Sequence, residues 1–244
     1  RYIEAIRILS DAGRKLDGAP LSLYNSFGHM ALSANDFWKL LTKAGLDFSH
    51  EYTAMVYMSG VLYGAADEFY RSFRPDMRVW GFIGYYWGAR HAAFQPWWFA
   101  LHRYGGFTWY AALAGTSGGG TWHNLLDIPN FGLTQDAAQL TDGLAGSGLL
   151  DGLGKLFLEY EWQPRDVAVL YSQPSLLVAW CRGTETRRSD LAPGSPNHAY
   201  HHSRASVRHA LEELLYQYDF VAPEQVREGA LDAYKALVLP HIEA

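Results

Sequence analysis

Residues 78–110 read RVWGFIGYYWGARHAAFQPWWFALHRYGGFTWY, and this stretch decides the fold. A buried strand is predicted over 79–86, a short aromatic helix over 95–104 and a second strand over 106–111. Two strands joined through a helix pair in parallel, with a right-handed crossover. The stretch therefore predicts an α/β fold built on a parallel sheet.

Aromatic side chains are concentrated in the same stretch, which holds five of the nine tryptophans of the chain. Aromatic rings at strand ends can stack on the apolar face of a sugar while polar neighbours hold its hydroxyls. Core filling is the alternative for each ring, since Trp is highly buried on average. The cluster as a whole points to carbohydrate.

Composition sets wide bounds on fold and partners. The 244 residues leave room for one large α/β domain or two smaller ones, with an ample core. A net charge of −5 argues against binding to a nucleic-acid backbone, because that affinity comes from clustered Lys and Arg. No stretch reaches the roughly 18 uninterrupted apolar residues of a membrane span. We therefore expect neither nucleic acid nor membrane as a partner.

The single cysteine, Cys181, excludes an intramolecular disulfide and a Cys-based zinc site. Together with the lack of a visible signal peptide, it favours a cytoplasmic location. Both ends of the sequence look cut, because residues 1–16 start directly as a helix without a cap and the last buried strand has no helix to cover it. We expect a segment of a longer protein.

Helix and strand periods alternate along the chain. Strands are predicted at 20–27, 46–52, 79–86, 106–111, 218–221 and 235–239, and a strand with its loop at 166–175. Helices are predicted at 1–16, 34–44 (capped by Ser33 or Asn35), 65–72, 95–104, 134–160 and 203–216 (capped by Ser203). Pro164 marks a boundary between two domains.

The two predicted domains have different patterns. Residues 1–163 look like the C-terminal half of a (β/α)8 TIM barrel, in which functional loops follow the strands. Residues 164–244 have the β-α-β pattern of the start of a small doubly wound domain.

Several motifs carry a family resemblance. The segments DVAVLYSQPS, HHSRASVRHALEELLYQYDFVAPEQV and AYKALVLPHIEA resemble the β-galactosidase trimerisation domain of glycoside hydrolase family 42. That domain is flavodoxin-like and resembles a class I glutamine amidotransferase without its catalysis. In the first domain, Asn25-Ser26-Phe27 is similar to the T-N-F at the end of the family's fifth barrel strand. His50-Glu51-Tyr52-Thr53 stands where the family has W-D-x-Y-P after strand six.

The resemblance implies hydrolysis of a terminal β-linked glycoside by a carboxylate mechanism, without a cofactor, in a homo-oligomer that would be a trimer. Two departures bear on activity. The family's acid/base Glu follows strand four, upstream of this segment, and its nucleophile is a Glu at the end of strand seven. Here that strand ends in Ile83-Gly84-Tyr85-Tyr86-Trp87-Gly88, with no carboxylate. Retaining hydrolysis needs two carboxyl groups about 5–5.5 Å apart.

Glu51 is the candidate catalytic carboxylate that this segment offers. His50 can tune its charge and Tyr52 can donate a hydrogen bond to it. An ordinary loop glutamate paired with Arg90 is the alternative. The candidate substrate-binding residues share a position at or just beyond a strand's C-terminal end. They are Asn25, His50, Tyr52, Tyr85, Trp87, His91 and Trp109.

No metal site is predicted. His198, His201 and His202 lie close together, but they precede the predicted helix, so helical spacing does not apply to them. The loop 115–120 lacks the pattern of a phosphate-binding loop. Cys181 has no nucleophile elbow around it and is expected to be a buried or half-buried thiol. Three function classes stay open: a β-galactosidase-like enzyme, a barrel that binds sugar without hydrolysing it, and an oligomerisation module of a larger enzyme.

Overall fold

The computed structural model describes residues 2–18, 22–25, 36–52, 65–83, 96–109, 126, 131–161, 165–184 and 199–244. The chain forms two compact units. Unit 1 comprises Arg1–Phe48, Met55–Met77 and Trp162–Ala244, and unit 2 comprises Ser49–Ala54 and Arg78–Glu161. The predicted domain boundary after residue 163 stays a prediction, because unit 1 takes residues from both sides of it.

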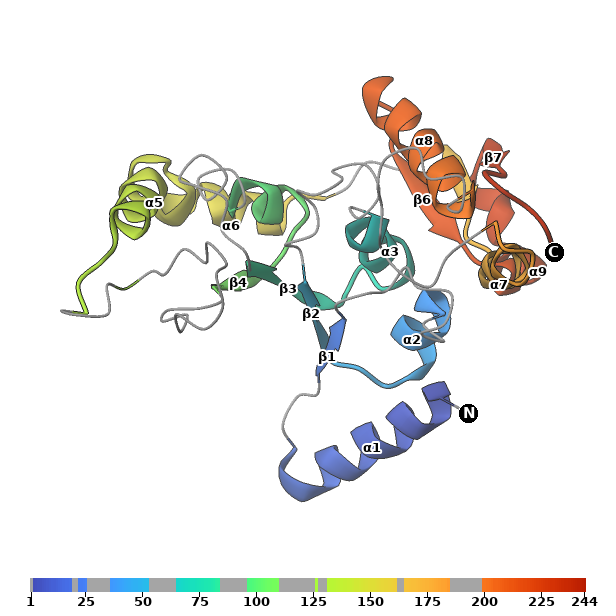
Figure 1. The fold of residues 1–244 in the computed structure, drawn as a ribbon, viewed down its shortest axis with the longest axis horizontal. Helices are drawn as coiled ribbons and strands as arrows, with labels where there is room; N and C mark the ends of the chain where they lie inside the picture. The colour runs from blue at the N-terminus through green and yellow to red at the C-terminus, as the bar shows by residue number, and fades with distance from the viewer. Residues whose placement is uncertain are drawn as a thin grey trace. The chain divides into compact units, whose positions relative to one another are not determined.

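Helices and strands alternate in the first half of the chain (Figure 1). In chain order they are α1 (Tyr2–Asp17), β1 (Ser22–Asn25), α2 (Phe37–Lys43), β2 (Phe48–Tyr52), α3 (Ala65–Phe73), β3 (Arg78–Ile83), the helical residues 96–101, and β4 (Gly106–Trp109). The four strands form one sheet in the order β1-β2-β3-β4. Strands β3 and β4 are parallel, so the predicted strand–helix–strand unit is confirmed.

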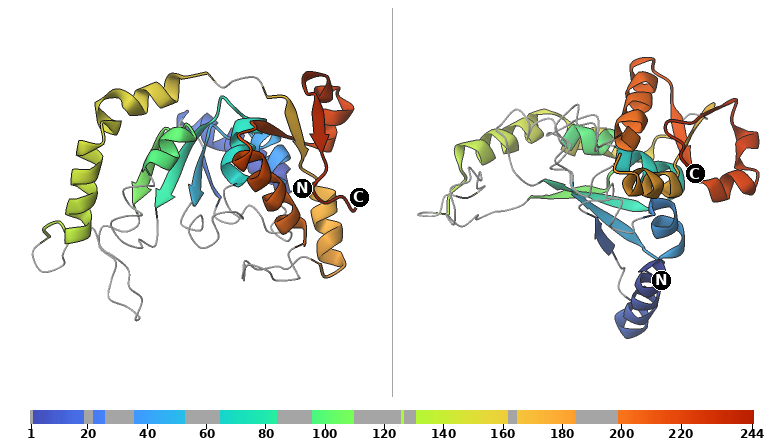
Figure 2. Two further views of the ribbon diagram at one scale, coloured as in Figure 1. Left: turned by 90° about the horizontal axis from the view of Figure 1, so that it is seen from above. Right: turned by 45° about the vertical axis from the view of Figure 1, so that its right-hand side comes forward.

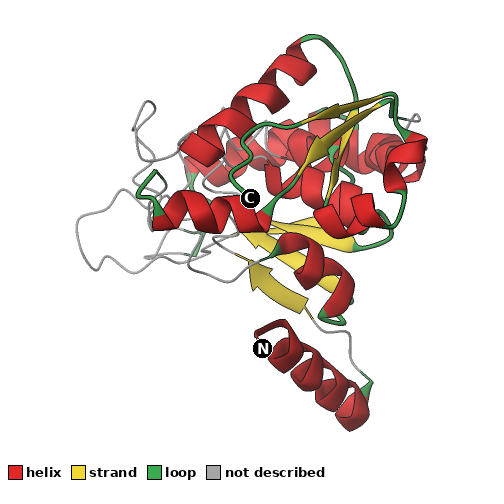
Figure 3. Cartoon of the chain, turned by 90° about the vertical axis from the view of Figure 1, so that its right-hand side faces the viewer, coloured by secondary structure: helices red, strands yellow, loops and turns green. Residues whose placement is uncertain are grey.

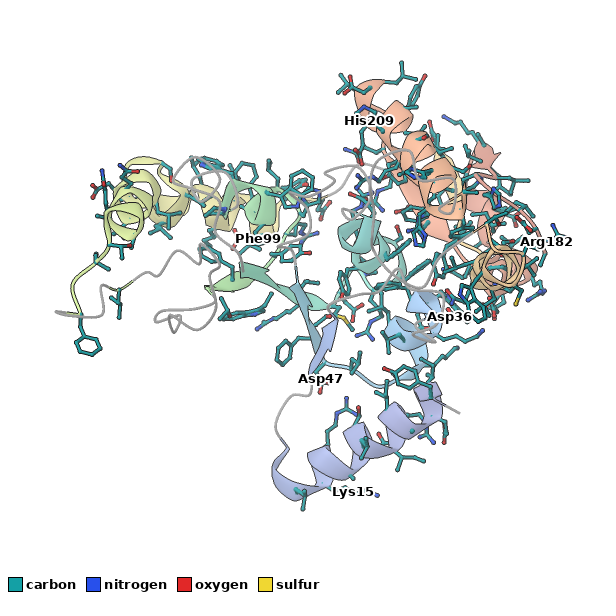
Figure 4. All side chains as sticks on the ribbon, viewed as in Figure 1. Lys15, Asp36, Asp47, Phe99, Arg182 and His209 are labelled. Carbon is teal, nitrogen blue, oxygen red and sulfur yellow. The ribbon has the colours of Figure 1, made fainter. Side chains whose placement is uncertain are left out.

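Gly81 lets the helix at residues 96–101 approach strands β3 and β4 of unit 2 closely. A Cβ at Gly81 on β3 would lie 2.3 Å from the ring of Phe99, which the helix presses onto the sheet (Figure 4). Phe99 is buried and stacks on Phe107 of β4, with 5.7 Å between the ring centroids. The neighbouring residue Trp80 is 42% exposed and lies over Gly106. One face of the β3–β4 pair is therefore covered by the helix, while Trp80 is open to solvent.

The helical stretch predicted over 134–160 is helical but is not one continuous helix. The structure has three pieces instead: α5 (Gln135–Gly146), the π-helical turn η3 (Leu149–Leu153) and α6 (Gly154–Glu159) (Figure 2). The Thr134 hydroxyl accepts a hydrogen bond from the Ala137 N–H and caps α5. Gly148 and Gly152 have φ angles of 71° and 129°, which interrupt the helix.

The second half of the chain contains a small sheet that belongs to unit 1 (Figure 3). Its elements are β5 (Val167–Leu170), α7 (Gln173–Cys181), α8 (Ala199–Glu213), β6 (Tyr218–Val221), α9 (Pro223–Arg227), the 3-10 turn η4 (Ala230–Ala233) and β7 (Ala236–Val238). The strand order is β6-β5-β7, and β5 pairs in parallel with both neighbours. The predicted α/β class with small parallel sheets is thus confirmed.

An aromatic cluster joins α2 and α3 to the small sheet within unit 1. The ring of Phe69 on α3 lies 4.6 Å from Phe220 of β6, 4.9 Å from Tyr171 after β5 and 4.8 Å from Phe37 of α2. All four side chains are buried. Burial of rings of this size is a large hydrophobic contribution, so this cluster is a main part of the core of unit 1.

Several predicted element boundaries are wrong. Helix α2 is capped by Asp36, which accepts from the Lys39 N–H, because its carboxylate sits directly before the first helical residue. The loop predicted after β5 is the start of α7, capped by Ser172. Helix α8 begins at Ala199, so Ser203 lies inside it and is not its cap. Strand β7 is largely exposed at the edge of its sheet, although it was predicted to be buried.

Candidate active site at the strand ends

The backbone places several predicted site residues at the C-terminal ends of strands. Asn25 is the last residue of β1, and Trp109 is the last residue of β4. His50, Glu51 and Tyr52 are the last three residues of β2. The structure describes the backbone of these five residues but not their side chains. Their convergence on one concavity stays a prediction.

The remaining predicted site residues, Tyr85, Trp87 and His91, lie outside the described residues. Ile83, the last residue of β3, pairs with Trp109 of β4. Because the two strands are parallel, Ile83 and Trp109 lie at the same end of the strand pair.

Glu51 is the one acidic residue on a strand among the described residues of unit 2. The other carboxylates described there lie in or beside helical segments and are exposed, namely Asp142, Asp151, Glu159 and Glu161. Functional side chains of barrel enzymes come from strand ends and from the loops that follow them. Among these residues, Glu51 is the one at the C-terminal end of a strand, and its catalytic role stays a prediction.

The described tryptophans of residues 78–110 differ in their surroundings. Trp97 makes an edge contact with Phe157 of α6 at 6.1 Å, and Trp98 stacks on His102 at 4.1 Å. The His102 ring is held further by a 2.9 Å hydrogen bond between its Nδ1 and the Trp98 carbonyl. Trp97 and Trp98 are half-buried and pack on rings of this chain, whereas Trp80 is 42% exposed.

The histidine segment differs from its prediction. His201 and His202 lie inside α8, so the argument that helical spacing does not apply to them is wrong. His198 lies outside the described residues. Within the parts of the chain that the structure describes, no group of three or more His, Cys, Asp or Glu residues is arranged to hold a metal ion.

Cys181 is the last residue of α7 and is exposed, so the prediction of a buried or half-buried thiol is wrong. The helical period explains this, because Leu176 and Ala179 define the buried face of α7. Position 181 is two residues beyond Ala179 and so falls on the opposite side of the helix.

The segment after β7 lies near the C-terminal ends of the strands of the small sheet, where α7 begins. In doubly wound sheets, ligands bind where the strand order reverses, which here is between β5 and β7. The Ser175 Oγ on the first turn of α7 accepts hydrogen bonds from the backbone N–H of Glu243 and of Ala244, at 3.1 and 3.2 Å. The Glu243 carboxylate also contacts Arg182 at 2.7 Å and His241 at 2.8 Å. The segment after β7 thus lies on the N-terminus of α7.

Comparisons with known proteins identify the fold. No family model and no curated protein matches the sequence. A solved structure of β-galactosidase from the psychrophilic Marinomonas ef1 matches with a TM-score of 0.64 over 99% of this chain, at 15% identity. The chain has a glycoside hydrolase-like fold.

A second solved structure agrees with the first. It is a GH5_18 protein from Bifidobacterium longum subsp. longum in complex with Manβ1-4GlcNAc, with a TM-score of 0.50, 17% identity and 97% of this chain covered. The glycoside hydrolase-like chain spans 40% of the length of the β-galactosidase and 58% of the GH5_18 protein. Among its described residues, no helix is both long and apolar enough to cross a membrane.

Proposed function

We propose that this chain is part of a β-galactosidase-like enzyme of glycoside hydrolase family 42 and that the whole protein hydrolyses a terminal β-linked glycoside. Residues 1–163 would be the C-terminal half of its TIM barrel, and residues 164–244 part of its flavodoxin-like domain. The observation that carries the proposal is Glu51 at the C-terminal end of β2, in a chain with a glycoside hydrolase-like fold. Functional groups of such barrels stand at this end of the strands.

Each predicted residue has a role in the proposal. Glu51 supplies one of the two carboxyl groups that glycoside hydrolysis requires, and the second comes from a part of the protein that this sequence does not contain. His50 and Tyr52 adjust the charge of Glu51 by hydrogen bonding. Asn25 binds sugar hydroxyls. The rings that would line the pocket are Tyr85, Trp87, His91 and Trp109.

A sugar-binding barrel without hydrolysis is the second candidate. It is favoured by the sequence after β3, where residues 84–88 contain no carboxylate at the position that the family resemblance gives to the nucleophile. One carboxylate can hold a sugar hydroxyl, but retaining hydrolysis requires two. The two candidates therefore differ in turnover and not in binding.

The deciding experiment uses Glu51→Gln in the full-length protein, because glutamine keeps the size and removes the charge. A catalytic Glu51 predicts that kcat on aryl β-glycosides falls roughly a thousandfold while sugar binding changes little. Glu159→Gln is the matched control, since Glu159 is an exposed carboxylate on α6. Unchanged turnover of the Glu51 variant would remove Glu51 from the mechanism. Sugar binding without turnover by the parent protein would favour the binding barrel.

The resemblance also supplies the proposal of a trimer, and the single cysteine together with the lack of a visible signal peptide supplies that of a cytoplasmic location. Light scattering on the full-length protein tests the trimer. A mass that stays at one chain over the accessible concentration range would contradict it.

A further inference from the structure

Among the described residues, β6 is an edge strand of the small sheet, because β5 lies on one side of it and no described strand lies on the other. Along a strand, the backbone groups of alternate residues point to opposite edges. The Val221 carbonyl points toward the segment after β5, where it accepts a hydrogen bond from the Tyr171 N–H. The carbonyl of Tyr218 and the N–H of Phe220 point the other way. Such outward groups are a template for pairing with another chain.

Two adjacent side chains of α3 bind these outward groups. The Arg71 guanidinium donates a hydrogen bond to the Tyr218 carbonyl at 2.8 Å. The Ser72 Oγ accepts a hydrogen bond from the Phe220 N–H at 2.9 Å. The same hydroxyl donates to the Glu68 carbonyl at 2.6 Å, which directs an oxygen lone pair toward β6. One acceptor and one donor of the edge are therefore satisfied as a neighbouring strand would satisfy them.

Helix α3 is fixed on this edge by its other side chains. Glu68 forms an ion pair with Arg71 from within the same helix, and both side chains are largely buried. The guanidinium of Arg71 also lies over the ring of Tyr218, 5.7 Å from its centroid. Phe69 packs on Phe220, as described above. Ring packing, an ion pair and two hydrogen bonds thus place one helix against one strand edge.

We propose that α3 covers the outer edge of β6. Arg71 and Ser72 take the place of a neighbouring strand and prevent β6 from pairing with β6 of a second copy of this chain. The device is independent of the proposed glycosidase activity, since it requires only the small sheet and α3.

Hydrogen exchange of the Phe220 amide in the full-length protein tests the first half of this proposal. Ser72→Ala removes the acceptor, and we expect exchange of this amide to accelerate about tenfold or more, the equivalent of one hydrogen bond. Ser72→Thr keeps a hydroxyl and should retain protection. The Val169 amide of the central strand β5 is the internal reference and should not change. Equal protection of Phe220 in the parent and in Ser72→Ala would overturn the proposal.

Self-association tests the second half. The triple variant Glu68→Gln, Arg71→Met and Ser72→Ala removes both edge contacts without leaving a buried charge unpaired. We expect its mass in light scattering to rise with concentration above that of the parent. Arg74→Met is the matched control, because Arg74 donates to the Leu41 carbonyl and not to β6. A folded triple variant with the parent's mass at every concentration would overturn the proposal, and if the variant does not fold, the exchange result decides.

Discussion

The phenol oxygen of Tyr171 accepts a hydrogen bond from the backbone N–H of Phe37, with 2.9 Å between the two atoms. The same hydroxyl donates to the Gln173 side chain at 2.8 Å. Phe37 is the first residue of α2, whose leading N–H groups have no partner within the helix. Tyr171 follows β5, so one buried hydroxyl ties the start of α2 to the small sheet within unit 1. Burial is the main cause that raises the pKa of Tyr171 well above its ordinary value, and the nearby Asp36 charge adds to it.

Removing this hydroxyl should destabilise unit 1. Tyr171→Phe keeps the buried ring but leaves the Phe37 N–H without its acceptor, and we expect a loss of about 1–3 kcal/mol in the free energy of unfolding. Denaturant titration of the full chain measures it. Tyr216→Phe is the control, because Tyr216 is exposed and should change stability little. A loss no larger than that of the control would show that water replaces the hydroxyl.

The Tyr171–Phe37 contact is of a kind that local sequence patterns do not predict. The sequence predicted strands over 20–27, 46–52 and 106–111, and these ranges contain β1, β2 and β4, because strand period is a local property. A contact between positions 134 apart has no local signal. The packing of α2 and α3 on the small sheet was therefore not predicted.

Helix starts were predicted less well than strand ends. Several Ser, Asp and Asn residues near a helix start can act as the cap, and the sequence does not say which one does. Ser203 has the right chemistry, but α8 continues four residues further toward the N-terminus, to Ala199. For the candidate site, the residue types near strand ends could be predicted from the sequence, whereas the packing of Trp97 on Phe157 depends on a distant helix.

Gly81 on β3 should not tolerate a side chain. A methyl group there would lie 2.3 Å from the Phe99 ring, so Gly81→Ala forces the helix at residues 96–101 away from the sheet. We expect a loss of about 1–3 kcal/mol in stability, as for overpacked cores. Gly146→Ala is the contrasting control, because nothing lies within 4 Å of a Cβ at the end of α5. That change should be neutral or stabilising by about 0.5–1 kcal/mol. Equal stabilities of the two variants, compared by thermal unfolding, would contradict the close contact.

The hydroxyl of Tyr234 should lose its proton at a higher pH than the ordinary tyrosine value of about 10. Burial, followed by the charge of Asp219, raises the pKa of Tyr234 to about 12, and its hydroxyl donates to the Asp219 carboxylate at 3.2 Å. Because the folded-state pKa lies above the unfolded value of about 10, the contribution to stability is complete below pH 10 and is lost as pH rises toward 12. Tyrosinate absorbance should show a component near 12 that Tyr234→Phe removes. Tyr216→Phe should leave that component in place, and a component that survives Tyr234→Phe belongs to another tyrosine.

The segment after β7 should leave α7 at acidic pH. A hydrogen bond with His241, followed by the Arg182 charge, holds the pKa of Glu243 below its ordinary value of 4.5. A depressed pKa means that the contacts stabilise the folded state above pH 4.5 and are lost as pH falls through the lower, folded-state pKa. The amide shift of Glu243, whose N–H binds Ser175, should therefore change with a midpoint below 4.5. Glu243→Gln should remove that midpoint, and Arg182→Met should move it upward because one favourable charge is gone (Figure 4). A parent midpoint at or above 4.5 would mean that the His241 and Arg182 contacts do not form in solution.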